Sequence, residues 1–185
     1  MPTSFPARAD LTVICGPMFA GKTSELIRRY EAAALANLRV RAFKPQRDIR
    51  YDPSAVVTHA GKSIAATAVE SPSRILLDGL GAELVLIDEA HFFGSPLLEP
   101  VLGLINAGHS VVVAGLERDH RGEPFDPFPR LLCEADTVVK LTCPCARCGA
   151  AAVHSQRLIE SSERIVVGGA ESYEPRCRSC FVPGK

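Results

Sequence analysis

The sequence lacks an excess of charge of either sign and lacks long apolar runs. Its 185 residues include 21 Lys and Arg against 21 Asp and Glu, so the formal net charge is zero. Proteins that bind duplex nucleic acid usually carry a basic excess or a basic stripe, so we expect small molecules or further copies of the chain as partners, and no nucleic acid. No apolar run reaches the roughly 18 residues that cross a bilayer. The first ten residues have no apolar core of a signal peptide, so we expect a cytoplasmic protein that does not contact a membrane.

The composition is that of an ordinary globular protein, except for the distribution of cysteine. Hydrophobic residues make up 46% and charged residues 23% of the chain. The length suits one domain with a small appendage. Five of the seven cysteines lie between Cys143 and Cys180. Because a reducing compartment keeps thiols free, this clustering predicts a metal site rather than disulfides.

Short apolar runs alternate with segments of helical composition before residue 142. This alternation predicts an α/β fold of the P-loop NTPase type, with a mainly parallel sheet covered by helices on both faces. Residues 44–62 are polar and irregular, and we interpret them as a mobile loop. The predicted strands are Leu11–Cys15, Arg39–Phe43, Ser63–Val69, Glu83–Ile87, Ser110–Gly115 and Thr137–Leu141. The predicted helices are Thr23–Ala36, one capped by Ser71 with Pro72 in its first turn, Pro96–Ala107 and Pro127–Glu134.

The composition changes near residue 141, where Cys, Gly and Arg become frequent. We therefore expect a loose tail over residues 1–10, a nucleotide-binding α/β domain over 11–141 and a small C-terminal domain over 142–185. Short β-like runs at Ala150–Val153 and Arg164–Val167 predict some strand structure in the last of these.

A phosphate-binding motif follows the first predicted strand. The segment GPMFAGKT fits the template G-x-x-x-x-G-K-[ST], and it comprises Gly16, Pro17, Met18, Phe19, Ala20, Gly21, Lys22 and Thr23. Glycines let the backbone N–H groups converge on phosphate oxygens, and the following helix adds its positive end. Lys22 is expected to reach the β- and γ-phosphates, and the Thr23 hydroxyl to bind Mg²⁺. The motif indicates a nucleoside triphosphate but does not decide the reaction.

Two acids follow the predicted strand ELVLI. Asp88 and Glu89 lie at its carboxyl end, the edge of an open α/β sheet where ligands gather. The first acid in this position typically holds Mg²⁺ through water, which leaves Glu89 free to deprotonate an attacking hydroxyl. The sequence contains no Asn-Lys-x-Asp tetrapeptide that reads guanine. A kinase that acts on a small hydroxyl acceptor therefore fits the chain better than a GTPase.

The C-terminal cysteines form two C-x-x-C pairs. Cys145 and Cys148 make one pair, and Cys177 and Cys180 the other. Four thiolates complete a tetrahedral Zn²⁺ shell with no position open for water, so the site is expected to be structural. Cys143 could replace Cys145 in this shell, although the C-x-x-C spacing favours Cys145.

A glycine-rich segment lies between the two cysteine pairs. It contains Val166, Val167, Gly168, Gly169 and Tyr173. A long loop in a small domain is usually functional. A glycine-rich backbone with one aromatic side chain is suited to hold a flat ring by main-chain hydrogen bonds and stacking.

Taken together, these motifs resemble the type II thymidine kinases, the cytosolic family of bacteria and animals. The segments GPMFAGKT, LVLIDEAHFF, AGLERDHRGEPF and VVGGAESYEPRC, with the CARC and CRSC pairs, correspond to the family in order and spacing. The resemblance implies transfer of the γ-phosphate of ATP to the 5′-hydroxyl of thymidine or deoxyuridine in pyrimidine salvage. It also implies a homotetramer that the end product dTTP inhibits.

The resemblance implies roles for individual residues. Glu89 would be the catalytic base, and Asp48 and Arg50 would act on the phosphate side, where Arg50 neutralises charge on the transferring group. Residues 148–177 would form a lasso whose main chain reads the pyrimidine. Met18, Phe92, Leu116 and Phe125 would line the base and sugar pocket, Ser155 would contact thymine, and Tyr173 would lie beside it.

Two histidines depart from the family pattern. His91 replaces a common glutamine and would sit near the nucleotide, and His120 replaces a common phenylalanine. If these changes are functional, they affect the substrate range and the pH profile rather than phosphoryl transfer. A second hypothesis is a zinc-ribbon P-loop ATPase module that acts on nucleic acid or protein. The C-terminal arginines favour that alternative, whereas the zero net charge disfavours it.

Overall fold

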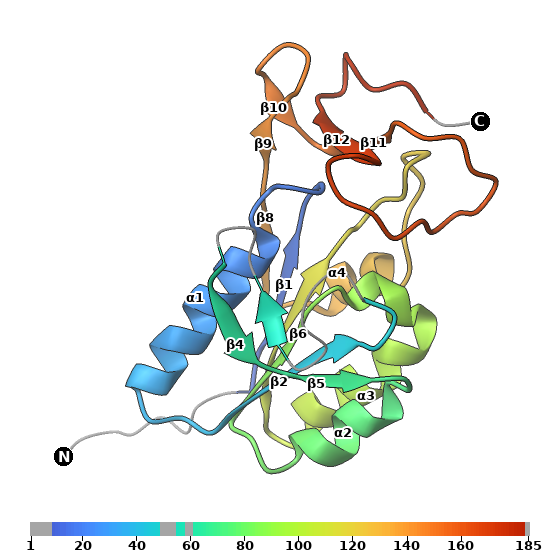
Figure 1. Cartoon of the computed structure of the whole chain (residues 1–185). Coiled ribbons are helices and arrows are strands. Elements are labelled where there is room, and N and C mark those ends of the chain that lie inside the picture. The colour runs from blue at the N-terminus through green and yellow to red at the C-terminus, as the bar shows by residue number, and fades with distance from the viewer. Residues whose placement is uncertain (1–8, 49–54, 58–60, 184–185) are drawn as a thin grey trace.

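A computed structural model describes residues 9–48, 55–57 and 61–183 (Figure 1). Its centre is a six-stranded sheet in the order β5-β2-β6-β7-β1-β8, and every pair of neighbours in it is parallel. The strands are β1 (Leu11–Cys15), β2 (Val40–Pro45), β5 (Thr67–Val69), β6 (Leu84–Ile87), β7 (Ser110–Gly115) and β8 (Thr137–Lys140). The expected fold class is therefore confirmed, and its carboxyl strand ends meet along one edge of the sheet.

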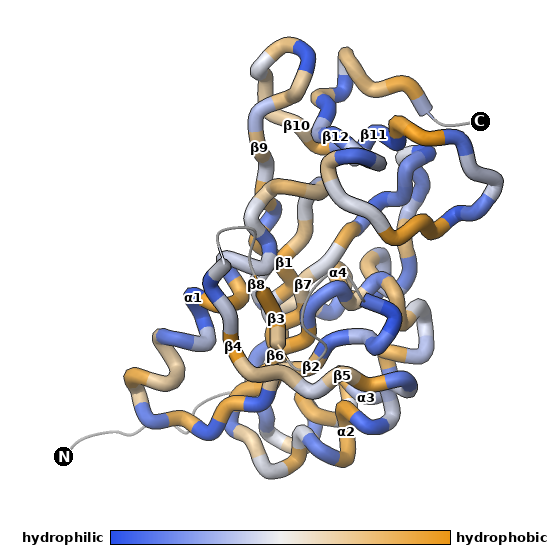
Figure 2. The backbone as a smooth tube through the Cα atoms, in the orientation of Figure 1, coloured by the Kyte–Doolittle hydropathy of each residue, from blue (hydrophilic) through white to orange (hydrophobic). Residues whose placement is uncertain are grey.

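Helices cover both faces of this sheet. α1 (Lys22–Leu35) lies on one face, where its Leu26 and Ile27 join Ile14 of β1 in one hydrophobic cluster. The other face carries the helices α2 (Ser73–Gly79), α3 (Leu98–Asn106) and α4 (Phe128–Glu134). Because alternate residues of a strand point to opposite faces, Val13 and Cys15 join this second cluster while Ile14 joins the first. Figure 2 shows the resulting hydrophobic stretches in the central strands.

The segment before β5 is more structured than its composition indicates. The predicted loop 44–62 contains β3 (Ala55–Val57), which pairs in antiparallel fashion with β4 (Ser63–Ala65). The predicted single strand Ser63–Val69 is wrong because this hairpin includes part of it. Its first part belongs to this hairpin, and its last part is β5 of the main sheet.

Several element boundaries also differ from the sequence predictions. Pro72, not Ser71, occupies the cap position of α2. The predicted helix from Pro96 begins as a 3-10 turn (η2, Ser95–Leu97) before α3, and a second 3-10 helix (η1, Ala90–Phe93) precedes it. Within the described ranges, no helix has the length and apolarity that a bilayer crossing requires.

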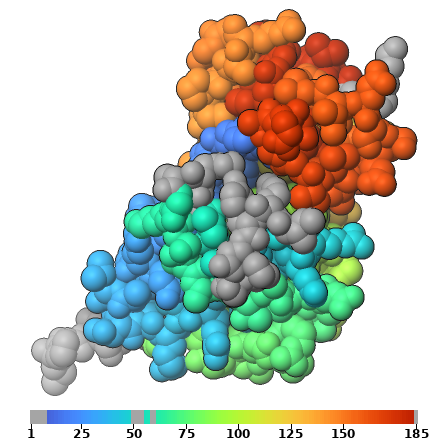
Figure 3. All heavy atoms as spheres, in the orientation of Figure 1, coloured from blue at the N-terminus to red at the C-terminus, as the bar shows by residue number. Residues whose placement is uncertain are grey.

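The C-terminal segment, residues 143–183, carries two small antiparallel sheets. One pairs β9 (Cys143–Pro144) with β10 (Ala151–Ala152), and the other pairs β11 (His154–Arg157) with β12 (Tyr173–Arg176). Figure 3 shows this segment, coloured orange to red, standing at one end of the α/β part. The predicted strand at 164–167 is absent from the described structure, because these residues belong to the loop that joins β11 to β12.

Candidate active site

The phosphate loop joins β1 to α1 as the motif requires. Gly16 has a φ of 143°, and a Cβ added there would lie 2.4 Å from the backbone oxygen of Leu141, so only glycine fits. Gly21, with a φ of 83°, is the residue from which α1 starts. The Lys22 ammonium donates a hydrogen bond to the Pro17 carbonyl at 2.7 Å, which holds the lysine folded over the loop.

The two motif groups expected to serve Mg²⁺ meet directly. The Thr23 hydroxyl donates to Asp88 Oδ2 at 3.0 Å, although 65 residues separate the two in the chain. Asp88 is buried, and burial together with the neighbouring charge of Glu89 raises the pKa of Asp88 to about 7. A divalent cation between these oxygens would offset that cost by favouring the carboxylate. The donor set of one hydroxyl and one carboxylate therefore fits Mg²⁺.

Glu89 occupies a strained backbone position at the end of β6. Its φ of 49° places a non-glycine residue in the left-handed region, a conformation that costs about 1–3 kcal/mol and tends to occur at functional sites. Its side chain is 15% exposed and lies against His91, with 3.6 Å between Glu89 Oε2 and His91 Nδ1. The Leu116 N–H donates to the same His91 nitrogen at 3.3 Å. His91 thus lies between the expected base and the end of β7.

One cavity of about 310 Å³ joins the phosphate loop to the C-terminal segment. It is lined by every residue expected on the nucleoside side, namely Met18, Phe92, Leu116, Phe125, Ser155, Val166, Val167, Gly168, Gly169 and Tyr173. On the phosphate side it is lined by Phe19, Gly21, Lys22, Thr23, Asp48, Asp88, Glu89 and His91. The structure thus brings together residues from both halves of the chain around one space. Gly16, Pro17 and Ala20 shape the loop without lining the cavity, and Arg50 lies outside the described residues.

Three further polar residues of the site have no role in the sequence predictions, although Glu117 and Arg118 lie within the segment AGLERDHRGEPF. Lys44 is fully buried at the end of β2, where its ammonium lies 4.0 Å from Asp48 and donates to the Ala55 carbonyl. Glu117 Oε2 accepts a hydrogen bond from the Gly16 N–H at 2.9 Å, which ties the phosphate loop to the segment after β7. Arg118 lines the cavity. Lys44 directly follows the predicted strand Arg39–Phe43, and a lysine at the end of a buried strand could have been read as functional, since Lys is rarely buried without a partner.

Ser155 has a contact that the resemblance does not indicate. Its hydroxyl oxygen accepts a hydrogen bond from the Met18 N–H at 2.9 Å, so β11 holds the tip of the phosphate loop. The Cys143 thiol lies 3.7 Å from the Met18 carbonyl oxygen. The C-terminal segment is therefore in direct contact with the phosphate cradle as well as with the nucleoside side of the cavity.

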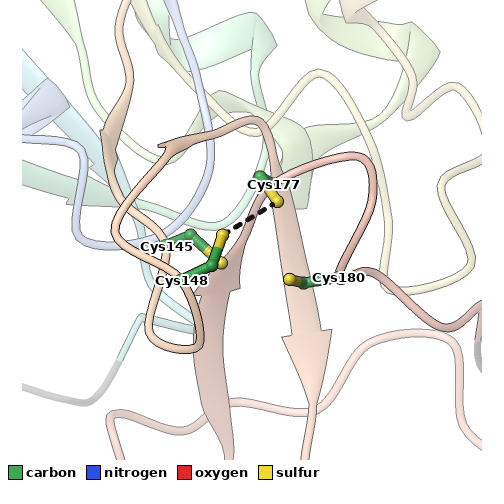
Figure 4. Close-up of side chains that lie close together, drawn as sticks. All are labelled: Cys145, Cys148, Cys177 and Cys180. Atoms are coloured by element: carbon green, nitrogen blue, oxygen red, sulfur yellow. Dashed lines mark hydrogen bonds between the residues drawn. The ribbon is translucent and has the colours of Figure 1, made fainter.

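The four cysteines of the two C-x-x-C pairs converge at the far end of the C-terminal segment (Figure 4). The ligand atoms of Cys145, Cys148, Cys177 and Cys180 all lie within 4.8 Å of one another, and the Cys148 and Cys177 sulfurs are 3.5 Å apart. Sulfurs around a tetrahedral zinc are about 3.8 Å apart, so this donor set fits the ion. Cys143 points instead to the phosphate loop, which decides in favour of Cys145 as the fourth member.

Hydrogen bonds adjust the acidity of these thiols. Burial alone would raise the pKa of Cys145, but backbone hydrogen bonds with Cys177, Arg147 and Cys148 lower it to about 6. A thiolate at neutral pH is the form that binds a metal ion. The pKa of Cys177 is lowered as well, chiefly by its hydrogen bond with Cys148, whereas the pKa of Cys148 is raised and hydrogen bonds with Cys148 and Cys177 raise that of Cys180 to about 12, so a bound cation would displace protons from these two thiols.

Comparison with known proteins places the chain in a family. The thymidine kinase family profile matches residues 9–181. The chain belongs to the thymidine kinase family. It is 47% identical to the thymidine kinase of Rhodothermus sp. (strain ITI 518) over 94% of this chain and 81% of the relative. It is 43% identical to the thymidine kinase of Bacteroides thetaiotaomicron over 95% of this chain and 88% of the relative.

The thymidine kinase match extends over both the sheet and the cysteine cluster. The family resemblance that the motifs indicate is thereby confirmed. Among solved structures, the genome packaging NTPase B204 of Sulfolobus turreted icosahedral virus 2 aligns with a TM-score of 0.47 and 13% identity, over 72% of this chain and 74% of that one. That similarity is too distant to inform the activity.

Proposed function

We propose that the protein is an ATP-dependent thymidine kinase that phosphorylates the 5′-hydroxyl of thymidine or deoxyuridine. The observation that carries this proposal is the cavity whose lining includes Lys22 and Thr23 of the phosphate loop, Glu89 at the end of β6 and the segment Val166–Gly169. A phosphate cradle, a carboxylate and a ring-sized glycine-rich wall around one space suit transfer from a triphosphate to a flat nucleoside.

Glu89 is the proposed base. Its position at the end of β6, beside the Asp88 that would hold Mg²⁺, supports this role, because a carboxylate near the metal and the γ-phosphate can take the proton of the acceptor hydroxyl. Its left-handed backbone fixes the direction of the side chain, and His91 restricts it from one side. Mg²⁺, when bound with ATP, would supply charge neutralisation between the β- and γ-phosphates.

Lys22 and Arg50 are the proposed cations of the phosphate side. A phosphate oxygen would compete with the Pro17 carbonyl for the Lys22 ammonium, because a charged acceptor binds an ammonium more strongly than a neutral one. Arg50 retains its expected role in neutralising the transferred group, a role that rests on the sequence resemblance.

The cysteine cluster is proposed to hold a structural zinc ion. With all four positions filled by sulfur, Cys145, Cys148, Cys177 and Cys180 leave no site for substrate or water. The ion would fix the start of β10 and the end of β12, and thereby the frame from which the glycine-rich loop extends. We also propose that a domain boundary lies near residue 141, where the main sheet ends.

Assays of purified protein test the function. With ATP and Mg²⁺, we expect thymidine and deoxyuridine to be converted to monophosphates, and deoxyadenosine and deoxyguanosine to be poor substrates. Glu89→Gln should lower kcat at least 1,000-fold, about the upper range for loss of a general base, while leaving ATP affinity unchanged. Full turnover by this variant would remove Glu89 from its role. ATP hydrolysis stimulated by a polymer, without nucleoside phosphorylation, would favour the zinc-ribbon ATPase alternative.

Three further properties follow from the same resemblance and are proposed with it. The reduced cysteine cluster supports a cytoplasmic location, where thiols stay free. The continuity of the nucleoside and phosphate sides of the cavity supports inhibition by dTTP, whose triphosphate could extend into the cradle. A homotetramer is proposed on the resemblance alone, and sedimentation equilibrium of the purified protein tests it.

A further inference from the structure

The loop that joins β11 to β12, residues 158–172, is held together from inside by one arginine. Arg157 is buried, and its guanidinium donates to the backbone oxygens of Glu163 at 2.6 Å and Arg164 at 2.9 Å. The same guanidinium donates to the Tyr173 hydroxyl at 3.1 Å, and this hydroxyl donates to the Val166 carbonyl at 3.0 Å. These hydrogen bonds join distant points of the β11–β12 loop, so we expect the loop to be internally rigid.

The contacts of this loop with the loop between β7 and α4, residues 116–127, are concentrated on Arg164. Arg164 Nε donates to Asp119 Oδ2 at 2.7 Å, and Arg164 Nη2 donates to the Pro124 carbonyl at 2.8 Å. The guanidinium carbon lies 5.1 Å from the centre of the Phe125 ring. Across the described parts of the two loops, each hydrogen bond between them involves Arg164.

The receiving side is already organised around Asp119. Its side chain is 2% exposed, whereas that of Arg164 is 49% exposed. Asp119 Oδ1 accepts the backbone N–H groups of Arg121 at 2.9 Å and Glu123 at 3.0 Å, and the Asp119 N–H bonds back to the Glu123 carbonyl. Oδ1 of Asp119 therefore stabilises the turn at residues 119–123, and Oδ2 is left to accept the hydrogen bond from Arg164.

We propose that Arg164 is a positioning residue that latches the β11–β12 loop over the nucleoside side of the cavity by binding Asp119. This inference rests on the proposed function. The four residues that follow Arg164 by two to five positions, Val166 to Gly169, line the cavity. Because Arg157 and Tyr173 make the loop rigid, one external attachment is enough to fix the distance of this backbone from the bound ring.

Loss of the latch acts by lowering the population of the closed loop. The apparent affinity for nucleoside falls in proportion to the fraction of protein that is closed. A charge-assisted hydrogen bond to a half-exposed arginine is partly screened by solvent. We therefore expect the KM for thymidine to rise about 5- to 20-fold, with little change in the KM for ATP, since the phosphate loop has no hydrogen bond to Arg164.

Asp119→Asn tests the latch without removing the turn. The asparagine oxygen can still accept the N–H groups of Arg121 and Glu123, while its amide nitrogen replaces the oxygen that faces Arg164. Arg164→Gln removes the other partner. Arg121→Gln is the matched control, because it removes an exposed arginine from the loop that carries Asp119. Asp119→Asn and Arg164→Gln should each raise the thymidine KM, and the double variant should raise it no more than either alone. Additive effects, or an unchanged KM in both single variants, would overturn the proposal.

Hydrogen–deuterium exchange of the full-length protein tests the latch without relying on turnover. In the wild-type protein, amides of residues 158–172 should exchange more slowly than in Asp119→Asn, and Arg121→Gln should match the wild type. Equal exchange in Asp119→Asn and wild type would refute the latch even if the protein phosphorylates thymidine. Faster exchange in Asp119→Asn of a protein that does not phosphorylate thymidine would leave the latch standing and refute the proposed function instead.

Discussion

Glu117 provides the sharpest test of how the phosphate loop is held. The structure places its carboxylate between two groups: Oε2 accepts the Gly16 N–H at 2.9 Å, and Oε1 lies 3.4 Å from the Lys140 ammonium. Glu117 is 7% exposed, whereas the Lys140 side chain is 46% exposed. The hydrogen bond is therefore shielded from water, whereas the ion pair is partly screened by solvent on its Lys140 side. The hydrogen bond should contribute more to the stability of the phosphate loop than the ion pair.

Two substitutions at Glu117 separate these contacts. Glu117→Ala leaves the buried Gly16 N–H without an acceptor, which costs about 1–3 kcal/mol, and we expect ATP affinity to fall about 5- to 150-fold as the loop loses its anchor. Glu117→Gln keeps an oxygen for the Gly16 N–H and loses only the charge that faces Lys140. Because the Lys140 side chain is about half-exposed, solvent screens this ion pair and limits its contribution to about 1 kcal/mol, so the loss of affinity should be below about fivefold.

The assay is direct ATP binding, measured by calorimetry in the presence of Mg²⁺, with thermal unfolding of each variant recorded alongside. Lys140→Gln is the control, because it removes the ion pair while Glu117 keeps its hydrogen bond to Gly16. ATP affinity should follow the order wild type, Lys140→Gln, Glu117→Gln and, weakest, Glu117→Ala. A Glu117→Ala protein that is less stable but binds ATP as tightly as the wild type would refute the anchor. Equal losses in the Gln and Ala variants would show that charge, not the hydrogen bond, is responsible.

The remaining predictions concern the loop glycine, the metal and one histidine. Gly16→Ala should weaken ATP binding at least about tenfold because its Cβ would collide with backbone, whereas Gly81→Ala, with open space around it, should change stability by less than about 0.5 kcal/mol. Chelation of zinc should raise the thymidine KM before it affects ATP binding, and unchanged nucleoside affinity in verified metal-free protein would contradict the proposed structural role of the zinc ion. Burial, and then the charge of Arg157, lower the pKa of His120 below 6.5. The unfolded chain therefore binds the extra proton first, and the free energy of unfolding should decline as the pH falls below about 6.5. In His120→Phe this decline should be shallower, by at most about 1.4 kcal/mol per pH unit. The free energy of unfolding is measured by urea titration at several pH values, and the same pH dependence in His120→Phe and wild type would contradict the lowered pKa of His120.

The central strands could be predicted because each is a continuous apolar run. LTVIC, ELVLI and SVVVAG became β1, β6 and β7, since parallel strands buried on both faces need no alternation of polarity. The prediction of one strand from Ser63 to Val69 was wrong because local composition does not show strand pairing. The run looks like one strand, but its halves pair with different partners, and pairing across the chain leaves no mark in local composition.

The site divides in the same way. The phosphate loop, the Asp-Glu pair and the cysteine pairs have fixed local spacing, so their positions could be found in the sequence. The structure brings the first two to one end of the main sheet and gathers the cysteines within the C-terminal segment. The role of Glu117 could not be found, because its hydrogen bond to Gly16 spans 101 residues and the segment AGLERDHRGEPF does not show which of its polar side chains contacts the phosphate loop. The Arg164 latch was missed likewise, since the run Arg164–Val167 looks like a strand until the loop is seen.

The junction after β8 has a kinetic consequence for the release of product. Only Leu141 and Thr142 separate β8 from β9, and Leu141 is fixed by its N–H bond to the Cys15 carbonyl at 2.8 Å and by its oxygen against Gly16. A tether this short, anchored beside the phosphate cradle, limits how far the C-terminal segment can move relative to the main sheet. Nucleoside entry and monophosphate departure would then be gated by a peptide loop, whose motions are faster than those of a hinged domain. The dimensions of each subunit should therefore change little throughout the catalytic cycle.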